Sequence, residues 1–258
     1  MPDMEYIFAT HNAGKVREIN AIFGEYGLTV KSLSEVGIVD EVPETGTSFT
    51  ENAIQKAAGY AKMLGGAVCA GASGRAASNL NSTANNGAAA NVTAPSIDTM
   101  ETAAGDAATA THYAVLADDS GFSVDALGGQ PGVYSSRFLG EDTPYQEKNQ
   151  TIIGRLKDVP EAERTARFIC VIACVLPDGR ILTAEGAIEG LVAYEPRGEN
   201  GFGYDPIFFL PEYGQTTAEL PAEEKNRISH RGLALRAMLK QLSAHGGTPI
   251  GDTKCNTL

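Results

Sequence analysis

The sequence predicts an α/β protein built around a mixed sheet, and three observations lead to this fold class. Strand-type and helix-type hydrophobic patterns alternate along the chain. Near the N-terminus a short apolar run precedes an amphipathic segment, which is typical of a strand followed by a helix. Further on, a Pro-Asp-Gly turn separates two long apolar runs, as in an antiparallel hairpin. Strands of both kinds in one chain indicate a mixed sheet.

The first part of the chain is expected to contain one strand and two helices. Residues 5–9 form a short apolar strand, and residues 15–26 place their apolar side chains on one helical face. A second helix is expected to begin near Ser48, because Glu51 follows at the spacing of a capping box. These patterns predict a β-loop-α unit followed by a further helix.

The second part is expected to complete the sheet. Residues 114–117 form a buried strand that ends at a pair of aspartates. Residues 168–176 and 181–188 flank the Pro-Asp-Gly turn and form a hairpin with long strands. A closing helix is expected near Ser229, because apolar residues recur after it at helical spacing.

A break in composition interrupts the predicted domain. Of the 46 residues from 66 to 111, 35 are Gly, Ala, Ser, Thr or Asn. Such a segment has little apolar surface to offset the entropy of ordering it. We therefore expect a single domain over residues 1–244, interrupted by a low-complexity insertion at 66–111, and a disordered tail over residues 245–258.

The charge balance limits the partners. The chain has 20 Lys and Arg against 32 Asp and Glu, a formal net charge of −12. Nucleic acids and anionic membranes bind clustered positive charge, so we expect neither as a partner. The chain has no apolar run of ~18–20 residues and no basic N-terminal region typical of a signal peptide. We expect a cytoplasmic protein whose four cysteines are reduced.

The loop after the first strand is a candidate anion site. Thr10, His11, Asn12, Ala13, Gly14 and Lys15 bring hydroxyl, amide and ammonium groups to a helix N-terminus. Free backbone N–H groups and the helix dipole favour an anion there. The segment is not a P-loop, because that motif requires Gly in place of Ala9 and Ser or Thr in place of Val16. The alternative is an N-cap at Thr10 or Asn12 with a solvated Lys15.

A pair of carboxylates is the second candidate. Asp118 and Asp119 follow the predicted strand, and Ser120 and a turn-permitting Gly121 come next. Paired carboxylates at a strand end can hold Mg²⁺ or activate water. The alternative is an Asx turn that closes the strand. Glu44, in a loop before the second helix, is a further metal-ligand candidate, although a single loop glutamate is usually solvated.

Two segments near the C-terminus complete the candidates. Residues 200–206 interleave glycines with Phe202 and Tyr204, which suits a backbone that closes over a flat heterocycle or an irregular turn with buried aromatics. Lys225, His230 and Arg231 lie at and before the N-terminus of the last helix. Cations there oppose the helix dipole unless an anion is present. The alternative is a solvated charge cluster.

Ordered motifs now connect these segments over most of the chain. They are T-x-N-x-x-K from Thr10 to Lys15, E-T-G-x-x-F-x-E-N-A from Glu44 to Ala53, A-D-D-S-G-x-x-V-D-A-L from Ala117 to Leu127, P-G-x-Y-S-x-R from Pro131 to Arg137, G-F-G-Y-D-P from Gly201 to Pro206 and S-H-R from Ser229 to Arg231. Together they resemble the inosine triphosphate pyrophosphatase family, which acts on non-canonical purine nucleoside triphosphates.

The resemblance implies an elongated mixed α/β domain whose two lobes enclose a central cleft, assembled as a homodimer. It implies Mg²⁺-dependent hydrolysis of ITP, dITP and XTP to the monophosphate and pyrophosphate. Asp119 would be the general base and, with Glu44, a metal ligand. The implied substrate contacts are Thr10, His11, Asn12, Ala13, Gly14, Lys15, Ser120, Phe202, Gly203, Tyr204, Asp205, Lys225, His230 and Arg231.

Two departures and two alternatives accompany this resemblance. His11 stands where a small residue is common, and the insertion directly precedes the strand that carries Asp119. A related enzyme could act on other modified nucleotides, or a non-catalytic sensor could bind a nucleotide through the same motifs. Glu44 and Asp119 favour an enzyme, because binding a polyanion requires no additional carboxylates.

Overall fold

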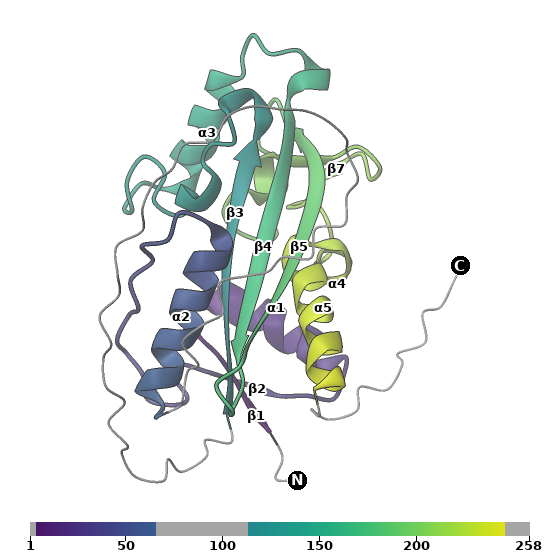
Figure 1. Cartoon of the computed structure of the whole chain (residues 1–258). Coiled ribbons are helices and arrows are strands. Elements are labelled where there is room, and N and C mark those ends of the chain that lie inside the picture. Colours follow the sequence, from purple (N-terminus) through teal and green to yellow (C-terminus); the bar gives the residue numbers. More distant parts are fainter. Residues whose placement is uncertain (1–3, 66–112, 246–258) are drawn as a thin grey trace, which may run out of the picture.

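A computed structural model describes residues 4–65 and 113–245 of the chain (Figure 1). The insertion predicted at 66–111 lies outside these residues, as does the predicted tail after its first residue. Among the described residues, no helix is both long and apolar enough to cross a membrane.

Seven strands form one mixed sheet in the order β2-β1-β3-β4-β5-β6-β7. β1 lies parallel to both β2 and β3, and each later neighbour pairs antiparallel. The predicted mixed sheet and the β4-β5 hairpin are therefore confirmed. The strands are β1 (Glu5–Phe8), β2 (Val30–Ser32), β3 (Tyr113–Val124), β4 (Thr165–Val175), β5 (Ile181–Val192), β6 (Phe208–Leu210) and β7 (Gln215–Thr216).

Helices cover both faces of the sheet (Figure 1). α1 and α5 pack through one apolar core on one face, and α2 packs through a second core on the other. α3 lies at the far end of the long strands. The helices are α1 (Ala13–Gly24), α2 (Phe49–Met63), α3 (Tyr145–Arg155), α4 (Ala222–Ile228) and α5 (His230–Ala244).

The three helices expected from the sequence are present, and side-chain caps fix where each begins. Asn12 Oδ1 accepts hydrogen bonds from the Gly14 and Lys15 N–H groups at the start of α1. Ser48 Oγ accepts from the Glu51 N–H of α2, and Ser229 Oγ accepts from the first turn of α5. Each cap satisfies N–H groups that have no partner within the helix.

β3 is longer than the sequence predicts, and this corrects the position of the aspartate pair. The strand pairs with β4 as far as Val124, so Asp118 and Asp119 lie inside it and not at its end. β4 supplies a backbone partner along this whole length, which overrides the local polar signal. Gly121 does not form the predicted turn, because it is also inside the strand.

The long strands β3 and β4 connect two lobes, which gives the domain its elongated shape (Figure 1). We call the part that holds α1, α2 and α5 the helical lobe, and the part that holds α3 and β6 the aromatic lobe. The aromatic lobe has its own core, which includes Phe122, Phe168, Tyr204 and Phe208. The predicted two-lobed mixed α/β fold is confirmed.

Close packing explains the glycine after the aspartate pair. A Cβ atom at Gly121 would lie 2.3 Å from the backbone oxygen of Gly132 and 2.8 Å from Phe49 Cε1 and Ser135 Oγ. The strand can approach these groups only without a side chain at this position.

We expect Gly121→Ala to lower the free energy of unfolding by at least about 1–3 kcal/mol, because a backbone oxygen must move. Gly154→Ala in α3 is the matched control, since its new methyl group would meet no atom within 4 Å. That variant should be neutral or up to about 1 kcal/mol more stable. Chemical denaturation measures both, and equal stabilities of the two variants would contradict this packing.

Candidate active site

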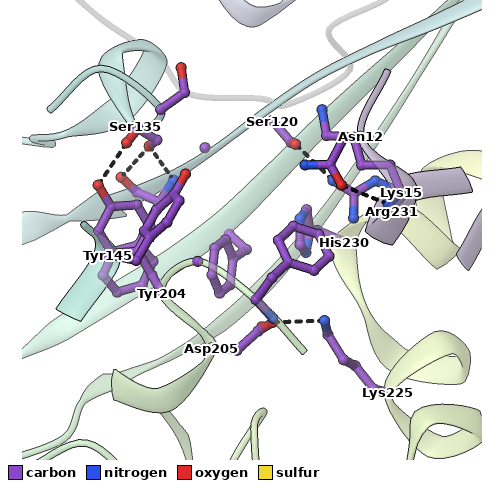
Figure 2. Close-up of a pocket in the computed structure, with 16 residues that line it drawn as sticks. Asn12, Lys15, Ser120, Ser135, Tyr145, Tyr204, Asp205, Lys225, His230 and Arg231 are labelled. Atoms are coloured by element: carbon purple, nitrogen blue, oxygen red, sulfur yellow. Dashed lines mark hydrogen bonds and ion pairs between the residues drawn. The ribbon is translucent and has the colours of Figure 1, made fainter. Parts of the chain in front are cut away.

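A cavity of about 280 Å³ lies between the two lobes (Figure 2), near the lower end of the size range of small-ligand pockets, roughly 300–1,000 Å³. At one end lie polar and charged groups of Asn12, Lys15, Ser120 and Arg231. At the other end lie Ser135, Tyr145 and Tyr204. The cavity therefore offers a cationic end and an aromatic end.

Most of the candidate residues meet in this cavity. Those that line it are Asn12, Lys15, Ser120, Phe202, Gly203, Tyr204, Asp205, Lys225, His230 and Arg231. The other candidates do not line it: Thr10, His11, Ala13, Gly14, Glu44 and Asp119. Thr10 and its neighbours form the exposed start of α1, whereas Glu44 and Asp119 belong to a second group of charges.

The start of α1 has the N-cap expected from one alternative and, as in the other, a lysine that is not solvated. Asn12 caps the helix, so the N–H groups of Gly14 and Lys15 are not free, contrary to the anion-site expectation. Lys15 is not solvated either, because its Nζ lies 2.9 Å from Asp118 Oδ1. At the cavity wall, this loop therefore contributes the side-chain ammonium group of Lys15 and the side-chain amide of Asn12.

Asp118 is the centre of a buried charge network. Its carboxylate contacts Lys15 and also Arg231, whose Nε lies 3.2 Å from Oδ2. Burial alone would raise the pKa of Asp118, but the charges of Lys15, Arg231 and Lys56 hold it well below its usual range. Asp118 thus stays ionised and orients two cations along the cavity wall.

Glu18 is a member of this network that the sequence analysis missed. It lies in α1 three residues after Lys15, and its carboxylate pairs with Lys225 and Arg231. Lys225 also lies 2.8 Å from Asp205. Helical spacing could have placed Glu18 on the same face as Lys15. Its partners come from distant parts of the chain, so no local pattern identifies them.

The aromatic end holds flat groups at stacking distance. His230 stacks on Phe168, with ring centroids 4.7 Å apart. Phe202 lies beneath two cations, 4.8 Å from Lys225 Nζ and 5.7 Å from Arg231 Cζ. Tyr204 is buried in the aromatic core, and its hydroxyl donates to the Ser135 carbonyl. Residues 200–206 therefore combine both expected features, since Phe202 and Tyr204 line the cavity and Tyr204 also packs in the aromatic core.

Asp119 lies on the opposite face of the sheet from Asp118, because successive strand residues alternate between faces. Its Oδ2 accepts a hydrogen bond of 2.9 Å from Asn52 of α2. Glu44 lies nearby and pairs with Lys56, whose Nζ also donates to the Asp118 backbone carbonyl. Asn52 belongs to the motif from Glu44 to Ala53, but neither Asn52 nor Lys56 was predicted as a site residue.

An open strand edge connects the two faces. β1 pairs with β3 only as far as Leu116. From there to Gly121, no strand among residues 4–65 and 113–245 pairs with that edge of β3. Lys56 reaches the edge from the α2 face, and Lys15 approaches Asp118 from the α1 face. A ligand in the cavity can therefore extend past this edge towards Asp119.

The chemistry of Asp119 and Glu44 fits a magnesium site. Burial and, less strongly, the nearby charge of Glu44 raise the pKa of Asp119 to about 6, against the hydrogen bond from Asn52. Asp119 Oδ1 accepts no hydrogen bond from the described residues. Mg²⁺ is commonly bound by one or two carboxylates together with substrate phosphates. A divalent cation would relieve the repulsion between the Glu44 and Asp119 carboxylates. The described residues hold no cluster of three or more His, Cys, Asp or Glu ligands.

A cationic group beside an aromatic cavity, at the open edge of a mixed sheet, suits a ligand with phosphates and a flat ring. The fold and site thus define a nucleotide-binding α/β protein. The model of the Ham1 family matches residues 6–84 and 90–241. The chain belongs to the Ham1 family, which confirms the resemblance seen in the motifs.

Individual relatives agree with the family match. The dITP/XTP pyrophosphatase of Bacillus subtilis (strain 168) is 40% identical over 240 residues, covering 93% of this chain and 98% of that protein. The protein of the same name from Escherichia coli O157:H7 is 40% identical, covering 92% and 96%. The solved structure of the Staphylococcus aureus Ham1 protein is similar with a TM-score of 0.68 and 31% identity, covering 93% and 99%.

We expect His230 to make stability sensitive to mild acid. Burial, with the charges of Arg231 and Lys225, holds the pKa of His230 well below its ordinary value of about 6.5. Below pH ~6.5 the unfolded chain binds a proton that the folded protein excludes, so stability falls as the pH falls. Between pH 7 and 5 the wild type should lose about 2 kcal/mol more than His230→Gln.

Denaturant unfolding at both pH values measures this difference. Comparing the two proteins cancels the contributions of other titrating groups, including Asp119. Equal losses in the wild type and the variant would show that His230 protonates freely in the folded state.

Proposed function

We propose that this protein hydrolyses the non-canonical purine nucleoside triphosphates ITP, dITP and XTP to the monophosphate and pyrophosphate, which removes deaminated purines from the nucleotide pool. Relatives that carry the name dITP/XTP pyrophosphatase support this substrate class. The observation that carries the proposal is the cavity, because its aromatic and cationic ends match the two parts of a nucleotide.

The charge of the site supports a requirement for a divalent cation. Four cations are interleaved with five carboxylates, so the site has a small negative charge before substrate arrives. They are Lys15, Lys56, Lys225 and Arg231 with Glu18, Glu44, Asp118, Asp119 and Asp205. A triphosphate adds several negative charges, and the described cations cannot balance both.

Glu44 and Asp119 are the residues that would hold Mg²⁺. When bound, Mg²⁺ would neutralise phosphate charge and polarise the phosphate oxygens. Lys15 and Arg231 orient the triphosphate from the cavity side, and Lys56 contacts it at the open edge of β3. The Ser120 hydroxyl accepts from Arg231 and lines the same wall, which supports its proposed contact with substrate.

Asp119 is the proposed general base. It would accept the proton of a water that attacks the α-phosphorus in line with the departing pyrophosphate. Its raised pKa, about 6, is closer to neutral pH than that of an ordinary aspartate, which makes the carboxylate a better proton acceptor. Asn52 donates to Oδ2 of this carboxylate, so Oδ1 would be the oxygen that accepts the proton of the water.

The aromatic end is the proposed base pocket. Phe202 and the His230-Phe168 stack provide flat surfaces for a purine. Hypoxanthine and xanthine have a carbonyl group at C6, whereas adenine has an amino group. A donor directed at that carbonyl would face another donor in adenine, and unpaired buried donors disfavour binding.

The cellular setting is also a proposal. The acidic chain is expected to act in the cytoplasm as a homodimer.

Thr10, His11, Ala13 and Gly14 would contact the terminal phosphates at the exposed start of α1, where the larger side chain of His11 would alter the affinity for phosphate.

We expect kcat/KM for ITP and XTP to exceed that for ATP by about 10⁴, with GTP intermediate and pyrophosphate as the first inorganic product. Purified protein, Mg²⁺ and a panel of nucleoside triphosphates test this, with products separated by chromatography. Equal rates for ATP and ITP, or phosphate as the first product, would contradict the proposed substrate or cleavage position.

Asp119→Asn should lower kcat by about 10²–10⁴, because an amide cannot accept the proton of the water. Its thermal stability in metal-free buffer should be equal to or above that of the wild type, since the charge of Asp119 is unfavourable in the folded protein. Asp125→Asn is the control, because Asp125 is exposed and pairs with Arg167 away from the cavity. A rate within about tenfold of wild type would remove Asp119 from the base role.

A further inference from the structure

Lys148 of α3 is a buried cation behind the aromatic end of the cavity. Its side chain is 1% exposed, and its ammonium group donates to the Ser136 carbonyl. The same group lies 4.9 Å from the centroid of the Tyr145 ring. Ser136 and Tyr145 both line the cavity, so Lys148 lies directly behind its wall.

No carboxylate balances this charge. Among the described residues, Lys148 forms no ion pair, whereas Lys15, Lys225 and Arg231 at the other end are all paired with carboxylates. The one carboxylate in the described cavity wall, Asp205, is already bonded to Lys225, to Thr217 and to the Phe202 N–H.

The surroundings of Lys148 stabilise its charged form without neutralising it. A carbonyl oxygen and the π face of an aromatic ring both attract an ammonium group, but neither carries a net charge. Burial lowers the pKa of Lys148 from its ordinary value, and no acidic neighbour opposes this. The positive potential of the ammonium group therefore extends into the aromatic end of the cavity, where solvent screening is weak.

We infer that Lys148 is a specificity-determining residue that favours purine bases carrying negative charge at their pyrimidine ring, and xanthine in particular. This inference rests on the proposed function. The xanthine ring of XTP has two carbonyl groups and loses a ring proton near neutral pH, whereas the hypoxanthine ring of ITP stays neutral there. A buried cation behind the base pocket attracts the xanthine anion and leaves the binding of hypoxanthine almost unchanged.

Neighbouring contacts keep this cation in place. Asn149, the next residue of α3, donates from Nδ2 to the Gly203 carbonyl, 3.1 Å away, and Tyr145 packs edge-on against Tyr204. Through Lys148 and Asn149, α3 thereby links the segment around Ser136 to the segment around Gly203. The buried stem of Lys148 has little freedom to withdraw its charge.

The test is the ratio of kcat/KM for XTP to that for ITP, measured between pH 5 and pH 8. Titrations of the enzyme that act on shared steps cancel in this ratio, whereas ionisation of xanthine does not. The ratio should rise with pH in the wild type. In Lys148→Met it should be lower by on the order of tenfold at pH 8 and close to wild type at pH 5.

Two variants separate charge from structure. Lys148→Arg keeps the charge and should retain most of the wild-type ratio, whereas a purely structural role would change XTP and ITP turnover equally. Lys157→Met, at an exposed position just after α3, is the control and should match the wild type. If Lys148→Met does not fold, Lys148→Gln replaces it, because its amide removes the charge and keeps a hydrogen-bond donor for the Ser136 carbonyl.

A wild-type ratio that stays flat with pH, or identical ratios in Lys148→Met and the wild type, would overturn the role of Lys148. Those results leave the proposed function intact as long as both substrates are hydrolysed. If the wild type hydrolyses neither ITP nor XTP, the proposed function fails, and the inference that depends on it fails too.

Discussion

The carboxylate of Asp118 joins parts of the molecule that are far apart in the sequence. It accepts contacts from Lys15 of α1 and Arg231 of α5, and it is fully buried in the middle of β3. A carboxylate at such a depth is tolerated only when cations and hydrogen bonds replace its water. The two helices are therefore held at fixed positions on one face of the sheet, and their cations are held along the cavity wall.

The neighbouring residue shows how strand geometry divides the chemistry. Asp119 points to the other face of β3, where it meets an amide and the charge of Glu44 instead of cations on both sides. The pKa of Asp118 is lowered, while that of Asp119 is raised. Two adjacent aspartates with opposite shifts can take different roles, one as an electrostatic anchor and one as a proton acceptor.

The aromatic lobe uses charge differently from the helical lobe. At the helical end the cations are interleaved with carboxylates, so binding a triphosphate there requires a rearrangement of existing ion pairs or an additional cation. At the aromatic end Lys148 has a carbonyl oxygen and a ring as partners. A charge without a counterion influences a bound base more strongly, because no neighbouring anion cancels its field.

The sequence by itself determined the fold class, the helix starts near Ser48 and Ser229, the β4-β5 hairpin and the family, because periodicity, capping residues and spaced motifs are local properties. It also identified most of the residues that line the cavity. Only the tertiary structure decided the length of β3 and the separation of Asp118 from Asp119 onto two faces. It alone gave Arg231 its partner Glu18, 213 residues away in the chain. Such contacts depend on which strands pair and which helices pack together, and no short segment contains that information.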